Sequence, residues 1–175
     1  MRVIAGEFRS RRLKSIPGLE TRPTPDRLRE TLFNIVAPQI GGAVFLDAYA
    51  GTGAVGIEAL SRGARHVIFL ERSRPAVEVI RENLASLKAE ARATVVTGMV
   101  LLKLPRHRAD IVFLDPPYDL EREYAAALDL LSETPPQLTI VQHSVRFALA
   151  DTYGKLRRSR LVKQGDNALS FYVEE

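Results

Sequence analysis

The 175-residue sequence contains no cysteine, which excludes disulfide bonds and thiolate ligands for a metal. Its three histidines, His66, His107 and His143, are scattered along the chain, and we expect no metal site. No apolar run approaches the roughly 20 residues that cross a bilayer. The first twelve residues, MRVIAGEFRSRR, lack the apolar segment of a signal peptide. These absences favour one cytoplasmic domain with no membrane anchor.

Positive charge is concentrated in two segments of the chain. Residues 1–30 hold eight arginines and lysines against four acidic residues, an excess equal to the net charge of +4 of the whole chain. A second basic run extends from Lys155 to Lys163. Such clusters are typical of a solvated basic face or of a surface that attracts a polyanion. Charge alone leaves both interpretations open.

From residue 43 onward, hydrophobic patterning predicts alternating strands and helices. The expected strands cover residues 44–47, 66–71, 93–97, 110–114 and 138–142, and the main helices cover 54–62, 75–88 and 121–131. Two further strands, 155–162 and 168–173, flank the turn signal at residues 164–167. We therefore predict an α/β fold with a mostly parallel sheet, helices on both faces and a terminal antiparallel hairpin.

The first 40 residues do not follow this alternation. Residues 1–15 alternate apolar and basic side chains and predict a short hairpin or extended arm. After a loop rich in proline, Thr24 is expected to cap a helix that has Pro25 at its first position. We interpret residues 1–40 as a basic hairpin and helix appended to a domain at 41–175.

The most distinctive stretch is Asp115-Pro116-Pro117-Tyr118, which follows the apolar run at 111–114. Two prolines cannot continue a strand, because each lacks an N–H group and fixes φ. The chain therefore presents a carboxylate, carbonyl groups and an aromatic ring at a strand's carboxyl end, where ligands bind in open α/β sheets. These groups suit a planar ligand with an amino group, such as a nucleobase.

Residues 51–56, GTGAVG, satisfy the G-x-G-x-x-G pattern of dinucleotide-binding loops, and Glu71 ends the next predicted strand. Two details argue against NAD. Three residues separate the first predicted strand from the first glycine, and the Asp47 carboxylate would lie close to a pyrophosphate. This aspartate suits a cofactor with a cationic amino-acid end and no phosphate, as in S-adenosylmethionine.

The segment DAYAGTGAVG resembles motif I of class I S-adenosylmethionine-dependent methyltransferases, and DPPY resembles their motif IV, typical of enzymes that methylate exocyclic amino groups. More narrowly, the chain resembles the RsmD family of bacterial 16S ribosomal RNA guanine-N2 methyltransferases over nearly its full length. Matching stretches are RVIAGEFRSRRLKS, TRPTPDRLRETLFNI, LDAYAGTGAVGIEALSRGA, FLERSRPAVEVIRENL and IVFLDPPY. The resemblance implies a Rossmann-like fold with a seven-stranded sheet.

The resemblance also implies roles for individual residues. The acceptor amino group would donate to the Asp115 carboxylate and the Pro116 carbonyl, while Tyr118 stacks on the base. The residues that would bind S-adenosylmethionine are Asp47, Ala48, Tyr49, Gly51, Gly53, Glu71, Arg72, Gly98 and Met99. The residues that would contact RNA are Arg9, Arg11, Arg12, Lys14, Arg22, Thr24 and Arg27. The expected partner is ribosomal RNA in the assembling small subunit, bound by a monomer.

The sequence departs from the family pattern in three places. An aspartate that binds the adenine amino group usually follows the third strand, where this chain has Gly98-Met99. The fifth strand usually ends in glutamate, where Gln142-His143 stands here, and Gln164 replaces a tyrosine in the tail. We expect a backbone carbonyl or packing by Met99 to replace the adenine contact.

Two other functions remain compatible with these motifs. Adenine-N6 methyltransferases acting on DNA or RNA also use the DPPY motif, although 175 residues leave no room for a separate DNA-recognition domain. A non-catalytic RNA-binding assembly factor could retain the fold, although the intact Asp47, Gly51, Gly53 and Asp115 argue against it. An NAD-dependent oxidoreductase does not fit the spacing of the glycine loop.

Overall fold

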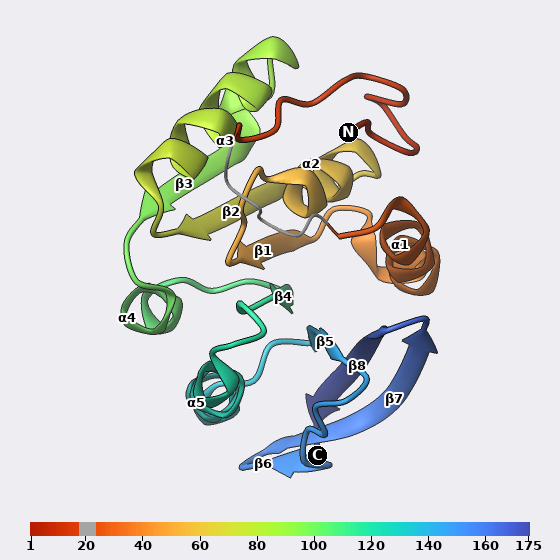
Figure 1. Cartoon of the computed structure of the whole chain (residues 1–175), viewed down its shortest axis with the longest axis vertical. Helices are drawn as coiled ribbons and strands as arrows, with labels where there is room; N and C mark the ends of the chain where they lie inside the picture. The colour runs from red at the N-terminus through yellow and green to blue at the C-terminus, as the bar shows by residue number, and fades with distance from the viewer. Residues whose placement is uncertain (18–23) are drawn as a thin grey trace.

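In a computed structural model, the structure describes residues 1–17 and 24–175. One mixed sheet, with the strand order β3-β2-β1-β4-β5-β8-β7-β6, forms the centre of the described part of the chain (Figure 1). Its strands are β1 Val44–Ala48, β2 His66–Glu71, β3 Ala93–Thr97, β4 Ile111–Leu114, β5 Leu138–Ser144, β6 Thr152–Tyr153, β7 Leu156–Gln164 and β8 Asn167–Glu174. The helices are α1 Asp26–Ile40, α2 Ala54–Ser61, α3 Arg74–Ser86, α4 Val100–Lys103 and α5 Glu121–Glu133.

The first five strands are parallel, and β8, β7 and β6 are antiparallel. The chain moves outward from β1 through β2 to β3 and then returns to place β4 on the other side of β1. The sheet therefore has a switch point between β1 and β4. In open α/β sheets, a crevice forms at the carboxyl ends of the strands on either side of such a point.

Helices cover both faces of the sheet, as predicted (Figure 1). One core cluster packs α1, α2 and α3 against one face, with Phe33, Phe45 and Phe69 among its buried side chains. The other packs α4 and α5 against the opposite face, where Tyr124 and Tyr172 are buried. The parallel strands are apolar on both faces because both faces are covered.

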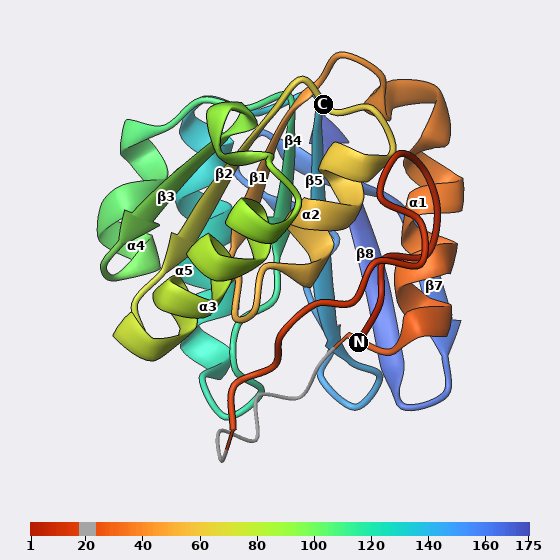
Figure 2. The same cartoon turned by 90° about the horizontal axis from the view of Figure 1, so that it is seen from above.

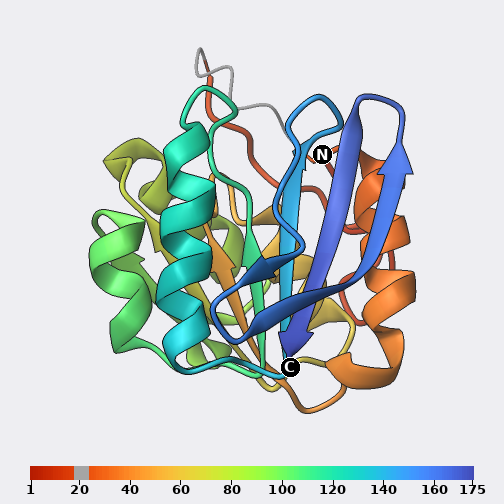
Figure 3. The same cartoon turned by 90° about the horizontal axis from the view of Figure 1, so that it is seen from below.

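The expected sheet has seven strands, whereas the structure has eight. The additional strand, β6, consists of two residues that pair with Arg157 and Leu156 of β7. Such a short segment carries too few residues to show a strand pattern in the sequence. The predicted terminal hairpin is confirmed, with Gly165 at φ +60° in the turn between β7 and β8 (Figure 3).

The expected cap of α1 is wrong. The helix begins at Asp26, Pro25 is the residue before it, and no side chain caps its first turn. Thr24 instead donates a hydrogen bond from Oγ1 to Gln142 Oε1 on β5, at 3.2 Å. The hydroxyl therefore joins two distant parts of the chain, which no local pattern could indicate.

The N-terminal arm, residues 1–15, contains a single antiparallel bridge, Arg2 to Arg12, in place of a hairpin with regular strands. Its apolar side chains Val3, Phe8 and Leu13 are buried in the same core as α1 and α2. This arm therefore packs as part of the sheet's own core.

A buried ion pair fixes the arm to the helices. The Glu58 carboxylate on α2 accepts hydrogen bonds from the backbone N–H groups of Ile4 and Ala5, at 2.8 and 3.1 Å. Arg29 of α1 is fully buried beside it, with 3.9 Å between Nε and Glu58 Oε1. Arg29 also donates to the Arg2 carbonyl at 2.6 Å. Each partner also has a second one, because Glu58 pairs with Arg62 at 2.9 Å and Arg29 pairs with Asp26 at 3.0 Å.

Candidate active site

The predicted site residues gather at the carboxyl edge of the parallel strands, around the switch point. Ala48 at the end of β1 is in register with Leu70 of β2 on one side and Leu114 of β4 on the other. The loops that follow these three strands therefore emerge side by side. We call Asp47–Gly56 with Glu71 the glycine-loop half, and Asp115–Tyr118 with Gln142 and Asn167 the DPPY half.

The glycine loop requires unusual backbone conformations. Tyr49, Gly51 and Gly53 have φ values of +62°, +57° and +84°. A Cβ on Gly51 would meet no atom within 4 Å, so the space in front of this residue is open. A Cβ on Gly56, in α2, would lie 2.3 Å from the Phe69 ring. The first glycine thus leaves room for a ligand, whereas Gly56 lets α2 pack closely on β2.

Asp47 is the buried acid of the glycine-loop half, with 1% of its surface exposed. Its Oδ2 accepts a hydrogen bond from the Gly56 backbone N–H at 2.9 Å. Burial raises the pKa of the Asp47 carboxyl well above its ordinary value, and the Gly56 hydrogen bond opposes that rise. The charges of Asp115 and Glu71 raise this pKa further. The site therefore concentrates negative charge around Asp47.

Glu71 holds the loops on either side of it. Its Oε2 accepts from the Gly51 N–H and its Oε1 from the Ser73 N–H, both at 2.8 Å. Each carboxylate oxygen keeps a further lone pair, which could accept from a ribose hydroxyl. Arg72 follows Glu71 with an exposed side chain.

Gly98 and Met99 lie beside Glu71, at the end of β3. The Gly98 N–H donates to the Glu71 carbonyl at 3.1 Å, and a Cβ on Gly98 (φ +147°) would lie 2.6 Å from Lys103 Cε. The Met99 side chain is 53% exposed. A half-exposed thioether at this edge offers an apolar surface for a flat ring, and its packing on the adenine stays a prediction.

The DPPY half is held by side chains from other elements. The Pro116 carbonyl accepts a hydrogen bond from the buried Tyr124 Oη of α5 at 3.2 Å. Tyr118 Oη donates to Asn167 Oδ1, at the start of β8, at 2.8 Å. Asp115 is partly exposed at the end of β4. The Pro116 carbonyl has one further lone pair for an acceptor amino group.

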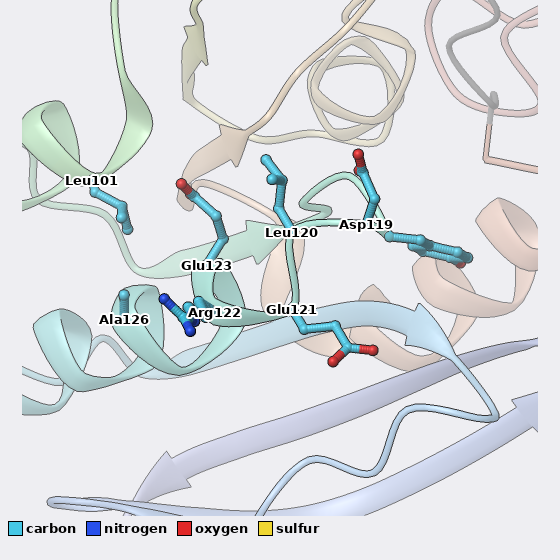
Figure 4. Close-up of a pocket in the computed structure, with 8 residues that line it drawn as sticks. Leu101, Asp119, Leu120, Glu121, Arg122, Glu123 and Ala126 are labelled. Carbon is cyan, nitrogen blue, oxygen red and sulfur yellow. The ribbon is translucent and has the colours of Figure 1, made fainter.

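A groove of about 490 Å³ lies beside this turn (Figure 4). It is lined by Leu101 of α4, by Tyr118 to Leu120 and by the first turns of α5. Glu123 of α5, which lines it, accepts a hydrogen bond from Tyr49 Oη. Burial is the main cause that raises the pKa of the Tyr49 hydroxyl, and the hydrogen bond to Glu123 raises it further. The Tyr49–Glu123 contact therefore joins the glycine loop to the helix that follows the DPPY turn.

The residues expected to contact RNA fall in three places. Thr24 is hydrogen-bonded to Gln142 of β5. Gln142 follows Val141, which is in register with Leu114, the last residue of β4 before the DPPY turn. The structure thus brings Thr24 close to the DPPY turn, and Arg27 is exposed in the first turn of the adjoining α1. Arg22 lies outside the described residues.

Of the four cations of the arm, Lys14 lies beside the glycine loop, because Asn83 accepts from its backbone N–H at 2.7 Å and donates to the Thr52 carbonyl at 3.1 Å, whereas Arg9 and Arg11 lie farther away. Phe8 donates its N–H to Ser61 Oγ, and Ser61 is the last residue of α2, at the end away from the glycine loop. This part of the arm therefore lies toward the amino ends of the parallel strands, and Arg9 lies there with it (Figure 2). Arg11 donates to the Ser86 carbonyl at the end of α3, and Lys14 pairs with Glu82 at 2.6 Å. Arg12 is exposed.

Tyr124, Gln142 and Asn167 support the DPPY half and were not predicted as site residues, although the sequence marked Gln142 as a departure from the family pattern. The sequence signal for Gln142 is its polar side chain within an otherwise apolar strand. In the structure, Gln142 is 1% exposed. Such a residue needs a hydrogen-bond partner. The pattern does not indicate which residue provides it.

The geometry fits the cofactor that the motifs imply. Asp47, Glu71 and Asp115 influence one another electrostatically, and neither Asp47 nor Glu71 forms an ion pair with a described residue. The ammonium and sulfonium charges of S-adenosylmethionine would complement these carboxylates. Asp47 and the open glycine loop would hold the amino-acid end, and Glu71 the ribose.

Within residues 1–17 and 24–175, no group of three or more histidine or acidic side chains is arranged to hold a metal ion. None of the helices in this described part is long and apolar enough to cross a bilayer.

Comparison with known proteins places the chain in a family. The model of the family described as "Conserved hypothetical protein 95" matches residues 1–173. The Bacillus subtilis "Putative rRNA methyltransferase YlbH" is 34% identical over 181 residues, which cover 98% of both chains. The "Ribosomal RNA small subunit methyltransferase D" of Escherichia coli K12 is 46% identical over 121 residues, which cover 67% of this chain and 60% of the relative.

The solved structure of "Putative methyltransferase yhhF from Escherichia coli" is also similar to this chain. It superposes with a TM-score of 0.88 at 34% identity and covers 100% of this chain and 98% of the other. The match extends over the sheet, both helical layers and the N-terminal arm. The chain therefore belongs to the RsmD family of class I S-adenosylmethionine-dependent methyltransferases.

Proposed function

We propose that this protein transfers a methyl group from S-adenosylmethionine to the exocyclic N2 amino group of a specific guanine in small-subunit (16S) ribosomal RNA. The observation that carries the proposal is the position of Asp115, which directly follows Leu114, the residue of β4 in register with Ala48 next to Asp47. A residue that can hold an acceptor amino group thus lies next to the half that fits the cofactor. The names of the Bacillus and Escherichia relatives support ribosomal RNA as the substrate.

The chain's own groups would act mainly by positioning and electrostatics. S-adenosylmethionine supplies a methyl group on a positively charged sulfur. The Asp115 carboxylate and the second lone pair of the Pro116 carbonyl would accept the two N–H groups of the amino nitrogen. These hydrogen bonds direct the nitrogen lone pair toward the methyl group and stabilise the positive charge that develops on nitrogen.

Tyr118 would stack on the base once the base has left its helical or loop stack. Its hydroxyl is held by Asn167, so the ring has a fixed position at the edge of the site. Asp115 need not be a strong base, because the methylated ammonium is itself very acidic and can release its proton to water. We place the reaction in the cytoplasm, on the assembling small subunit, with the enzyme as a monomer.

The test is transfer of radiolabelled methyl from S-adenosylmethionine to small subunits from cells that lack the enzyme. Naked 16S RNA and duplex DNA are assayed in parallel, and the labelled nucleosides are identified after digestion. Label in N2-methylguanosine supports the proposal. Label in N6-methyladenine would replace it with the adenine alternative. Cofactor binding without transfer to any of the three substrates would favour a non-catalytic assembly factor.

A further inference from the structure

Of the exposed cations on or next to the terminal hairpin, three lie in the loop after β5 and in the half of β7 nearest the turn. Arg146 belongs to the loop after β5, and Arg160 and Lys163 belong to β7. None of the three forms an ion pair with another described residue. We call them the hairpin cluster. By contrast, neighbouring Arg158 is paired with Asp151 at 2.5 Å.

Backbone and side-chain contacts connect this cluster to the DPPY half. Asn167, the first residue of β8, accepts from Tyr118 Oη, and it is in register with Gln164, which follows Lys163. Val145, which precedes Arg146, donates its N–H to the Asp166 carbonyl in the hairpin turn at 3.0 Å. The turn therefore lies at the same edge of the sheet as the site (Figure 3). A nucleic acid whose base stacks on Tyr118 would pass beside it.

The shape of β7 also favours an extended polyanion. β6 pairs only with Leu156 and Arg157, so among the described residues β7 has no strand partner on its outer side over the rest of its length. Successive side chains of a strand point to opposite faces. Arg160 and Lys163 therefore lie on opposite sides of this open edge, and a phosphate backbone that follows the edge can contact both. Cations on an open edge also prevent pairing with other strands, and this protective role does not require RNA.

We propose that the hairpin cluster binds the phosphates of the RNA strand that flanks the target nucleotide. The proposal rests on the proposed function, because it takes the position of the target base from Tyr118. It adds a binding surface that approaches the site from β5 and β7, on the side opposite the glycine loop. The charges of the N-terminal arm lie elsewhere, and Arg9 is near the end of α2 that faces away from the site.

The test compares two triple variants of the full chain that lose the same charge. Arg146→Gln, Arg160→Gln and Lys163→Gln remove the hairpin cluster. The matched control, Arg65→Gln, Arg106→Gln and Arg108→Gln, removes three exposed arginines that precede the amino ends of β2 and β4. Binding of a target-site RNA fragment is measured by fluorescence anisotropy over a salt series. Calorimetry with S-adenosylmethionine checks that both variants keep the cofactor site.

For the hairpin-cluster variant we expect at least about a tenfold loss of RNA affinity at low salt. The slope of log K against log salt should become shallower by about 2, as for three lost phosphate contacts. In methyl transfer, KM for RNA should rise while kcat at saturation stays near that of the unmodified chain. The control should change affinity far less. Equal losses in both variants would overturn the proposal, because they would reflect net charge alone.

A protein partner within the subunit is the other possible occupant. If the hairpin-cluster variant binds naked RNA as the control does but has a raised KM only for assembled subunits, the cluster contacts ribosomal protein and the proposal is wrong. Failure of the proposed function gives a different result. The unmodified chain would then transfer no methyl group, whereas the binding assay would still report on the cluster.

Discussion

In the glycine-loop half of the site, backbone N–H groups hold the acidic side chains, whereas in the DPPY half side chains from distant segments hold the turn. Asp47 is bonded to Gly56, nine residues away, and Glu71 to Gly51 and Ser73. Tyr118 depends on Asn167, 49 residues away. The first half is built largely from two short segments, whereas the second is complete only when the chain has folded.

This difference affects how each half should respond to mutation. Backbone donors persist through most substitutions, so changes in the glycine-loop half should alter charge while leaving geometry in place. In the DPPY half, loss of one side chain should release the turn that it supports. Four substitutions or sets of substitutions test this contrast, in order of decreasing effect on methyl transfer.

Asp115→Ala should have the largest effect, because it removes the carboxylate that we propose accepts from the acceptor amino group. Loss of one such preorganised group lowers kcat by about 10²–10³-fold. Asp115→Asn is the matched control, since it keeps an acceptor oxygen without the charge and should retain more activity. Single-turnover methyl transfer measures both variants. If the Asp115→Ala and Asp115→Asn variants lose activity equally, the charge of Asp115 matters and the position of its oxygen does not.

Asp47→Asn should weaken cofactor binding and stabilise the protein. Replacing a charged partner of an ammonium group costs about 1.5–3 kcal/mol, or roughly 10- to 100-fold in affinity. The asparagine oxygen can still accept from the Gly56 N–H, and the substitution removes a carboxyl whose ionised form is penalised by burial, which raises its pKa. A raised carboxyl pKa means that ionised Asp47 destabilises the fold at neutral pH.

Calorimetric titration and thermal unfolding without cofactor give the two readouts for Asp47→Asn. We expect Tm to rise by a few degrees, since about 1 kcal/mol corresponds to 2–4 °C for a chain of this size. A lower Tm would contradict the view that backbone contacts maintain this half, because it would show that the carboxylate charge supports the loop.

Tyr118→Phe should have a smaller effect. It removes the hydrogen bond to Asn167, worth about 1 kcal/mol, but keeps the ring that we propose stacks on the base. KM for RNA should rise a few-fold, whereas Tyr118→Ala should lose a further 1–3 kcal/mol of stacking. In the background of Asn167→Ala, Tyr118→Phe should cause no further loss. Equal losses of activity in the Tyr118→Phe and Tyr118→Ala variants would show that anchoring of the turn, and not stacking, determines the activity.

The contrast between the two halves also explains what the sequence could predict. Nearly all strand and helix positions after residue 43 were predicted to within two residues, because buried strands and amphipathic helices have strong periods. The positions of Asp47, the glycine loop, Glu71 and the DPPY turn at the ends of their strands followed from the same pattern. Their roles toward a ligand remain predictions.

Contacts between distant segments could not be predicted. Thr24 and Gln142 are 118 residues apart, and Thr24 has the residue type of a helix cap, so local rules assigned its hydroxyl to the wrong partner. The arm was expected to be a short hairpin or extended arm, because its basic residues alternate with apolar ones. Its burial depends on Glu58, whose carboxylate binds two backbone groups of the arm, and the sequence does not indicate that contact.

The smallest effect on methyl transfer should come from His143, which lies beneath the DPPY half on β5. Its Nε2 is 2.8 Å from Ser170 Oγ, and its Nδ1 lies within 3.0 Å of the carbonyl oxygens of Ser144 and Phe147. Burial lowers the pKa of His143, and the carbonyl contacts and Arg158 modify the shift. The folded state therefore keeps the ring neutral at a pH where the unfolded chain binds a proton.

The sign of the pH effect follows from this difference. The contribution of His143 to stability is complete above the unfolded pKa of about 6.5 and declines as the pH falls below it. One such proton changes the free energy of unfolding by at most about 1.4 kcal/mol per pH unit. Urea unfolding at pH 7.5 and 5.5 should show a smaller pH dependence for His143→Gln than for the unmodified chain. His107→Gln, before β4, should keep that dependence, and an equal reduction in both variants would contradict the assignment to His143.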